Sequence, residues 1–477
     1  MPEVTCAPPV DSDGPATSRL HALRRAGGKI RCNGARAPCT SRTKAINTDL
    51  LIAATLVVVT IALWATGRLP EYLTALLFFA AATVLTPVPA TTIFSGFASA
   101  AFWLVLSGFV LGAAIRKTGL ADRLAASLQP HLAGSWLRMV GGTVAVSYAA
   151  AFVMPSNMGR IALLMPMVLA IAEKSGIRPG SRGWFGLALA VGFGTFQLSA
   201  SILPANVPNL VMAGAIEATY GLHLHYLPYL LTFTPVLGVL KGALVVALVY
   251  LLFPARPAVI ASAVQRTPWS TAERRLILIL LCTLGMWMTD ALHGISPAWI
   301  GLAAACVCLL PRVGFLTSDE FGQASNFRTC LYVAGLLGLS AFVAATGLGD
   351  RVGDHVIPLL PLDPAQPFVS YLSVFGLGEL LNALTTANGV PAVFTPLAQE
   401  IADASGLPLT TVLMFQVLSY STPLLPYQAS PIVVAMMMGK VPLREGVKLS
   451  LWLAVATLLV VAPLQFLWMR MLGLLAA

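Results

Sequence analysis

The chain has 477 residues with a formal net charge of +10, yet only 10% of its residues are charged, where a soluble domain carries roughly 25%. Hydrophobic residues make up 57% and the mean hydropathy is +0.82, which excludes a soluble protein. The apolar residues form runs of roughly 17 to 25, the length that crosses a bilayer as a helix. We therefore expect an all-α polytopic membrane protein.

Half of the net positive charge belongs to residues 1–46, which contain eight basic and three acidic residues. This segment lacks the apolar stretch of a signal peptide, and its Pro, Gly, Ser and Arg content predicts a disordered basic tail. The charge therefore gives no reason to expect a nucleic-acid partner.

Twelve apolar runs follow in chain order: 48–66, 71–88, 98–116, 138–172, 184–222, 227–253, 272–290, 295–311, 328–346, 366–402, 409–438 and 447–473. Four of them are too long for one helix, and each is interrupted by residues that free backbone groups and supply short polar side chains, at 155–160, 203–209, 385–389 and 423–431.

The two halves of the chain resemble each other. Residues 118–123 (TGLADR) recur as 346–351 (TGLGDR), and the segment 166–176 recurs as 396–406. This predicts membrane repeats at 48–253 and 272–473, joined by a cytoplasmic linker at 254–271. With five crossings and one re-entrant hairpin in each, the second repeat would be inverted, and most basic loop residues would fall on one side, the cytoplasmic one. Three alternatives then remain for the basic tail: it lies outside, a further element precedes residue 48, or translation starts downstream.

Unpaired backbone groups inside a membrane cost several kcal/mol each, so four interruptions predict one shared site within the protein. Half-helix N-termini would present N–H groups and partial positive charge to an anion, and freed carbonyls with Ser, Thr and Asn oxygens would suit Na⁺. The alternative is that the prolines kink ordinary spanning helices.

Several motifs resemble the divalent-anion/sodium symporter family, within a wider ion-transporter superfamily. They are Phe102-Trp103-Leu104, Lys117-Thr118-Gly119-Leu120, Pro155-Ser156-Asn157, Ala162 to Pro166 and Asn206-Val207-Pro208-Asn209. The resemblance implies a homodimer with a fixed scaffold and a mobile transport domain, two re-entrant hairpins and elevator-type alternating access. It also implies Na⁺-coupled uptake of dicarboxylates, citrate or sulfate.

The family's hairpin tips carry Ser-Asn-Thr. Here Met158 follows Ser156-Asn157, and the second tip reads Thr386-Ala387-Asn388. We expect substrate to be bound by Ser156, Asn157, Arg160, Thr386, Asn388, Pro208, Asn209 and Ser430. We expect Na⁺ to be bound by Ser156, Asn157, Asn206, Thr385 and Gln428, with no other metal and no cofactor.

Two cations are predicted at membrane depth. Arg160 follows the first tip, where an ionised side chain costs roughly 2.5–3.5 kcal/mol. It would offer a countercharge to the anion or replace one bound Na⁺, or it would pair with a structural carboxylate such as Glu379. Lys241 is expected to snorkel or to pair within the scaffold.

The sequence thus predicts a secondary active transporter for small divalent anions, with Na⁺ symport as the first expectation. A proton-coupled or uncoupled anion permease or exchanger of the same fold is the alternative. A membrane-embedded enzyme would need a catalytic cluster at depth, and the six histidines form none with acids in a hairpin, so we expect no enzyme. The expected partners are the small anion, the lipid bilayer and a second copy of the chain, in a bacterial inner (cytoplasmic) membrane.

Overall fold

The computed structural model describes residues 42–120, 123, 134–258, 268–324 and 326–475. The chain divides into two compact units, residues 1–46 and residues 47–477. Of the first unit the structure describes residues 42–46, where α1 begins. The rest of the predicted basic tail lies outside the described residues, as do residues 259–267 of the predicted linker.

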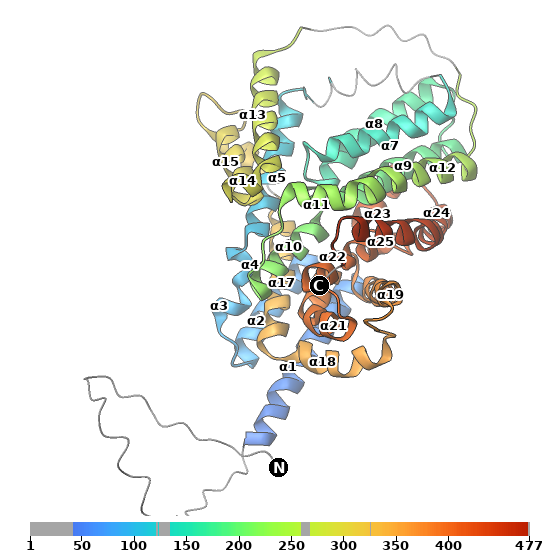
Figure 1. Cartoon of the computed structure of the whole chain (residues 1–477). Helices are drawn as coiled ribbons and strands as arrows, with labels where there is room; N and C mark the ends of the chain where they lie inside the picture. Colours follow the sequence, from blue (N-terminus) through green and yellow to red (C-terminus); the bar gives the residue numbers. More distant parts are fainter. Residues whose placement is uncertain (1–41, 121–122, 124–133, 259–267, 325, 476–477) are drawn as a thin grey trace, which may run out of the picture. The chain divides into compact units, whose positions relative to one another are not determined.

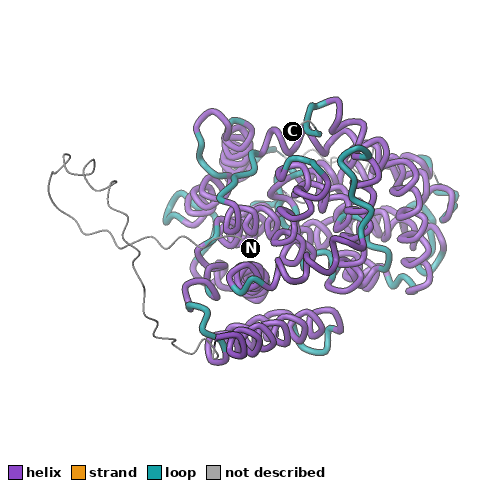
Figure 2. The backbone as a smooth tube through the Cα atoms, turned by 60° about the horizontal axis from the view of Figure 1, so that its bottom comes forward, coloured by secondary structure: helices purple, strands orange, loops and turns teal. Residues whose placement is uncertain are grey.

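All regular structure in the described residues of the second unit is helical, as the purple segments of Figure 2 show. In the first half of the chain the α-helices are α1 (Arg42–Thr66), α2 (Glu71–Leu85), α3 (Ala90–Ile93), α4 (Ser95–Ala98), α5 (Ala100–Lys117), α7 (Trp136–Ala151), α8 (Asn157–Lys174), α9 (Arg182–Phe196), α10 (Val207–Tyr220), α11 (Tyr226–Phe233) and α12 (Lys241–Leu252).

In the second half they are α13 (Thr271–Met288), α14 (Asp290–His293), α15 (Pro297–Leu309), α16 (Ser318–Ala324), α17 (Phe327–Ala345), α18 (Leu348–Val356), α19 (Pro367–Thr385), α20 (Val390–Phe394), α21 (Ala398–Ser405), α22 (Leu409–Tyr420), α23 (Ser430–Gly439), α24 (Leu443–Ala456) and α25 (Ala462–Met471). Short π-helical segments join α11 to α12 and α24 to α25 without a break.

Seven helical segments in the described part of the chain are long and apolar enough to cross a membrane. The two longest are Tyr226–Leu252 and Leu443–Met471. The expectation of an all-α polytopic membrane protein is confirmed, while the inverted repeat and the re-entrant hairpins stay predictions.

Each predicted interruption separates two helices. α7 ends at Ala151 and α8 begins at Asn157, and α19 and α20 are parted at residues 386–389. Short 3₁₀ turns (Leu198–Ser201 and Leu203–Ala205) lie between α9 and α10, and another (Pro426–Gln428) lies between α22 and α23. The proline-rich polar segments therefore end helices inside the protein.

Close approach of backbones fixes the packing of α17 against the first helices of the chain. A Cβ added at Gly96 would stand 2.2 Å from the carbonyl oxygen of Ala334, and one at Gly338 would stand 2.3 Å from that of Ile93. Glycine is required where helices meet this closely. In Figure 1, α2, α3, α4 and α17 form one group, and α7, α8, α9 and α12 lie together in another.

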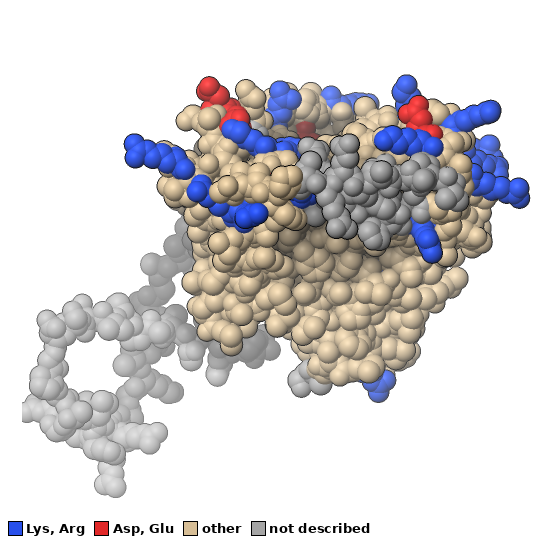
Figure 3. Space-filling view, turned by 90° about the horizontal axis from the view of Figure 1, so that it is seen from above, with Lys and Arg blue, Asp and Glu red and all other residues tan. Residues whose placement is uncertain are grey.

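Basic side chains gather along the upper edge of the view in Figure 3, with few acidic ones among them, and the surface below that edge is almost free of charge. At the end of α5, Lys117 pairs with Glu320 of α16 at 2.5 Å, and Arg123 pairs with Glu273 at the start of α13 at 2.6 Å. The first contact ties the basic end of α5 to α16, and the second ties Arg123 to the start of α13.

Candidate functional site

All four interruptions contribute residues to one cavity. It leaves about 80 Å³ open to the centre of a water-sized sphere. Its lining from the interruptions consists of short polar or apolar residues: Pro155, Ser156, Asn157, Met158, Asn206, Val207, Asn388, Ser430 and Pro431. The prediction that the four breaks share one site therefore agrees with the structure, and five of the proposed site residues, Ser156, Asn157, Asn206, Asn388 and Ser430, lie in it.

Asn157 ties the first interruption to the second. Its amide nitrogen donates to the side-chain oxygen of Asn206 at 2.7 Å, and its own oxygen accepts from the hydroxyl of Ser199 at 3.1 Å. Beside it, the hydroxyl of Ser156 accepts from the backbone N–H of Gly159 and caps α8. The oxygens expected to bind Na⁺ at this tip are thus already engaged within the protein.

Four helices of ten or more residues in the described part of the chain have their first residue in the cavity lining: α2, α8, α10 and α23. The residues that precede α10 and α23, Asn206 and Ala429, make no side-chain capping hydrogen bond. Because the first N–H groups of a helix lack intrahelical partners and carry partial positive charge, these ends attract an anion.

Arg160 is fully buried and does not line the cavity. Its guanidinium donates to the carbonyl oxygen of Met154 at 2.6 Å, to that of Ala205 at 3.1 Å and to that of Thr195 at 3.3 Å, and also to the side-chain oxygen of Asn157. Four oxygens from the first two interruptions and the end of α9 therefore surround one fixed positive charge. The pairing with Glu379 considered from the sequence is not formed.

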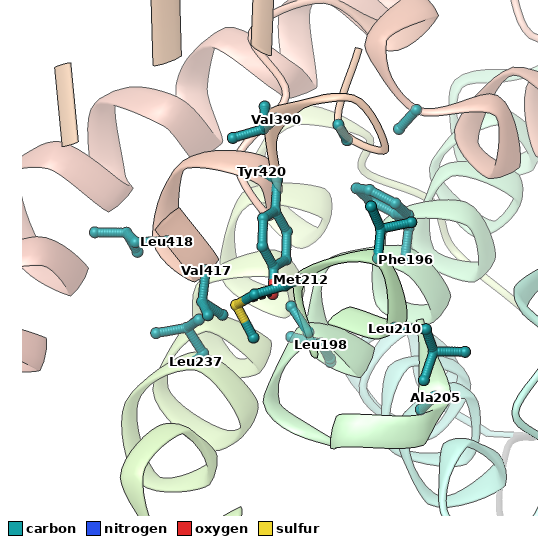
Figure 4. Packing of buried hydrophobic residues seen from close by; sticks show 14 of the residues in the cluster. Phe196, Leu198, Ala205, Leu210, Met212, Leu237, Val390, Val417, Leu418 and Tyr420 are labelled. Atoms are coloured by element: carbon teal, nitrogen blue, oxygen red, sulfur yellow. Dashed lines mark hydrogen bonds between the residues drawn. The ribbon is translucent and has the colours of Figure 1, made fainter. Parts of the chain in front are cut away.

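Asn209 also lies away from the cavity and makes structural hydrogen bonds there. Its amide nitrogen donates to the carbonyl oxygens of Ser199, Ala200 and Ile202 at 2.9–3.4 Å, and its oxygen accepts from the hydroxyl of Tyr420 at 2.9 Å. Figure 4 shows Tyr420 directed toward Met212 in the apolar packing around this point. With its neighbour Pro208, Asn209 shapes the second interruption and does not face the cavity.

At the second tip, residues that were expected to bind substrate or Na⁺ make hydrogen bonds to the backbone instead. The hydroxyl of Thr385 donates to the carbonyl oxygen of Leu381 at 2.8 Å, and Thr386 has a left-handed φ of 90°. The side-chain oxygen of Gln428 accepts from the N–H of Leu425 at 2.6 Å. Neither threonine nor Gln428 lines the cavity.

Lys241 is also fully buried, which excludes the first of its two expected roles, snorkelling, and leaves the second, pairing within the protein. Its ammonium donates to the carbonyl oxygen and hydroxyl of Ser421 at 2.8 and 3.2 Å, and to the hydroxyl of Thr422 at 2.9 Å. It thereby neutralises the C-terminal end of α22, where backbone carbonyls lack intrahelical partners. The carboxylate of Glu379 accepts no hydrogen bond from the described residues.

The opposite wall of the cavity was not anticipated. It is formed by α2, α5 and α17, and its polar groups belong to Glu71, Thr329 and Tyr332. The hydroxyl of Ser430 donates to the carboxylate of Glu71 at 3.4 Å, and Tyr332 lies within hydrogen-bonding reach of Thr386 and Asn388. In the sequence, the only indication of this wall is that the apolar run 71–88 begins with an acidic residue, Glu71, and no motif surrounds that residue.

Comparison with known proteins gives consistent matches. The profile of the family described as "Sodium:sulfate symporter transmembrane region" matches residues 43–475. Dicarboxylate transporter 2.2, chloroplastic, of Arabidopsis thaliana is 23% identical over 86% of this chain and 77% of its own length. Dicarboxylate transporter 2, chloroplastic, of Spinacia oleracea is 25% identical over 69% of this chain and 64% of its own, and a membrane protein of Cupriavidus necator is 25% identical over 68% and 66%.

Among solved structures, that of the YdaH transporter of Alcanivorax borkumensis matches with a TM-score of 0.52, covering 89% of this chain and 98% of that one at 15% identity. At this identity the likeness concerns the fold alone. The matches with the Cupriavidus and Spinacia proteins span about two thirds of those relatives' lengths. Since the family profile covers nearly the whole chain, this membrane protein belongs to the sodium:sulfate symporter transmembrane family.

Proposed function

We propose that the protein is a secondary transporter that carries small divalent anions, dicarboxylates first, across the membrane. The observation that carries this proposal is the cavity at which α8, α10 and α23 begin, each at one of the interruptions. Membership of the family supports transport, and relatives named as dicarboxylate transporters support the substrate class.

The described lining of the cavity has no basic side chain, but its other groups can bind an anion. Ser156, Asn157, Asn388 and Ser430 offer neutral donors, and the uncapped ends of α10 and α23 offer backbone N–H groups. Neutral donors and helix dipoles bind an anion and also let it leave, which transport requires. A tight ion pair would slow release.

The geometry around Arg160 bears on the coupling ion. Na⁺ symport is the first expectation from the sequence, but the guanidinium occupies a cluster of three carbonyl oxygens and one amide oxygen, the kind of donor set that suits Na⁺. A covalently attached cation in this cluster favours the alternative, in which transport proceeds without Na⁺ at this position.

The proposal includes elevator-type alternating access in a homodimer of the bacterial inner membrane, as the family resemblance implies. One observation supports a two-part arrangement: one cavity wall comes from α2, α5 and α17, and the other from the four interruptions. Movement of one wall past the other would expose the site to each side in turn.

Uptake into proteoliposomes tests the proposal. Labelled succinate, citrate and sulfate are supplied with Na⁺ or with choline, for the wild type and for Asn388→Ala at the cavity. Asn326→Ala, an exposed helix cap of α17, is the matched control. We expect saturable uptake by the wild type and the control, with at least a tenfold loss in Asn388→Ala. Absence of uptake of every anion would refute the substrate class.

A further inference from the structure

Glu71 is the one acidic side chain in the described lining of the cavity. It is the first residue of α2, and its carboxylate oxygen lies 3.4 Å from the hydroxyl of Ser430, the first residue of α23. The residue before Ser430 provides no side-chain cap. The Glu71 carboxylate therefore stands at the end of α23 that an incoming anion would use.

A divalent anion and an ionised Glu71 cannot share this cavity without a large repulsion. Two anionic groups that approach closely repel each other, and the repulsion is relieved when one of them takes up a proton. A neutral Glu71 also gains an O–H donor, which can serve a substrate oxygen. Binding of the anion therefore favours protonation of Glu71.

The other charged and titratable groups near Glu71 are not placed to take up this proton. On α17, Tyr332 faces the same cavity and Arg328 stacks on the ring of Tyr72 at 5.6 Å. Arg68 precedes α2 and is exposed, α1 contributes the indole of Trp64 to the Glu71 carbonyl, and α3 and α23 bring no titratable side chain.

We propose that Glu71 is the proton-binding residue of the transport cycle. When the site is empty its carboxylate acts as an internal anion at the start of α23, and when substrate binds it takes one proton from bulk water. Anion and proton then cross together, and both leave on the other side. This inference rests on the proposed function, and it names the residue behind proton coupling.

Calorimetric titration of the purified protein with succinate or sulfate tests the inference. Each titration is run in two buffers of different ionisation enthalpy, between about pH 7.5 and about pH 8.5, where carboxyl groups with a pKa of about 4 to 5 are ionised. The difference in heat gives the number of protons taken up per anion. For the wild type at the upper pH we expect uptake of about one proton per bound anion. Its affinity for the anion should fall up to about tenfold for each unit by which the pH rises.

The variant Glu71→Gln keeps the shape and the contact with Ser430 but has no carboxylate. It should bind the anion with no proton uptake and with an affinity independent of pH. Glu445→Gln, which removes the acidic residue from the first turn of α24 outside the cavity, should behave as the wild type. Wild-type binding without proton uptake, or equal uptake in Glu71→Gln, overturns the inference but leaves the transporter in place. If neither probe binds the wild type, both the inference and the proposed substrate class fail.

Discussion

Arg160 donates a hydrogen bond to the side-chain oxygen of Asn157, and this links a buried cation to a residue that lines the cavity. The amide nitrogen of Asn157 is then turned toward Asn206. Arg160 is thus a positioning residue, which acts on the anion site through Asn157 and the carbonyls that it holds.

Replacement of Arg160 should expose this role. In Arg160→Ala the oxygens of Met154, Thr195 and Ala205 lose their shared donor, and removal of a buried partner costs about 3–5 kcal/mol. We expect a lower melting temperature, partly restored by Na⁺, because the vacated oxygens then accept a free cation. Melting in Na⁺ and in choline measures this, with the exposed Arg116→Ala as control. Melting that is equally low in both salts would show that no cation site is uncovered.

Asn209→Asp should unfold the second interruption. The substitution replaces a donor to three carbonyl oxygens by a group that repels them, at a cost of about 1–3 kcal/mol for each unpaired group. Asn326→Asp is a matched control, because aspartate caps a helix as well as asparagine does. Thermal melting and labelled-anion uptake should fall only in Asn209→Asp. Normal uptake by that variant would remove Asn209 from this role.

Lys241 and Glu379 should show coupled effects on stability. Lys241→Met removes the donor to Ser421 and Thr422 at the end of α22 and the electrostatic partner of Glu379, so it should destabilise the protein by about 3–5 kcal/mol. Addition of Glu379→Gln should recover part of the loss. A double-mutant cycle on denaturant unfolding measures the interaction, and strictly additive changes would contradict it.

The contact between α5 and α16 should weaken in acid. Hydrogen bonds from Lys117 and from the backbone of Thr317 lower the pKa of the Glu320 carboxyl from 4.5 to about 2. Because the folded-state pKa is depressed, the stabilisation is complete above about pH 4.5 and is lost as the pH falls toward about 2. The melting temperature of the wild type should drop more over this range than that of Lys117→Met. Parallel curves would show that the pair contributes nothing.

The sequence predicted the membrane class, the four interruptions and their common site, because proline and short polar residues inside a long apolar run end helices where the freed backbone groups need partners. Ser156, Asn157 and Asn388, which it predicted to bind the anion, line the cavity, and their binding role stays a prediction. The sequence could not separate residues that face the cavity from those that hold it, since Arg160 and Asn209 are the last residues of the first two interruptions and yet do not line the cavity.

Glu71 escaped prediction for a different reason. Its place in the cavity depends on the packing of α2 against α17 and on the position of Ser430, which follows 359 residues later. Contacts of this kind leave no local pattern. The close approach of Gly335 in α17 to Ala75 in α2, where an added Cβ would stand 2.5 Å from the Cβ of Ala75, is likewise visible only in the fold.

The most direct test of the account is anion exchange in proteoliposomes that are loaded with unlabelled succinate and given labelled succinate outside, in choline and in Na⁺. We expect rapid exchange at the same rate in both salts, because the guanidinium of Arg160 takes the place of a Na⁺ ion at the first interruption. Exchange that occurs only with Na⁺ would contradict it.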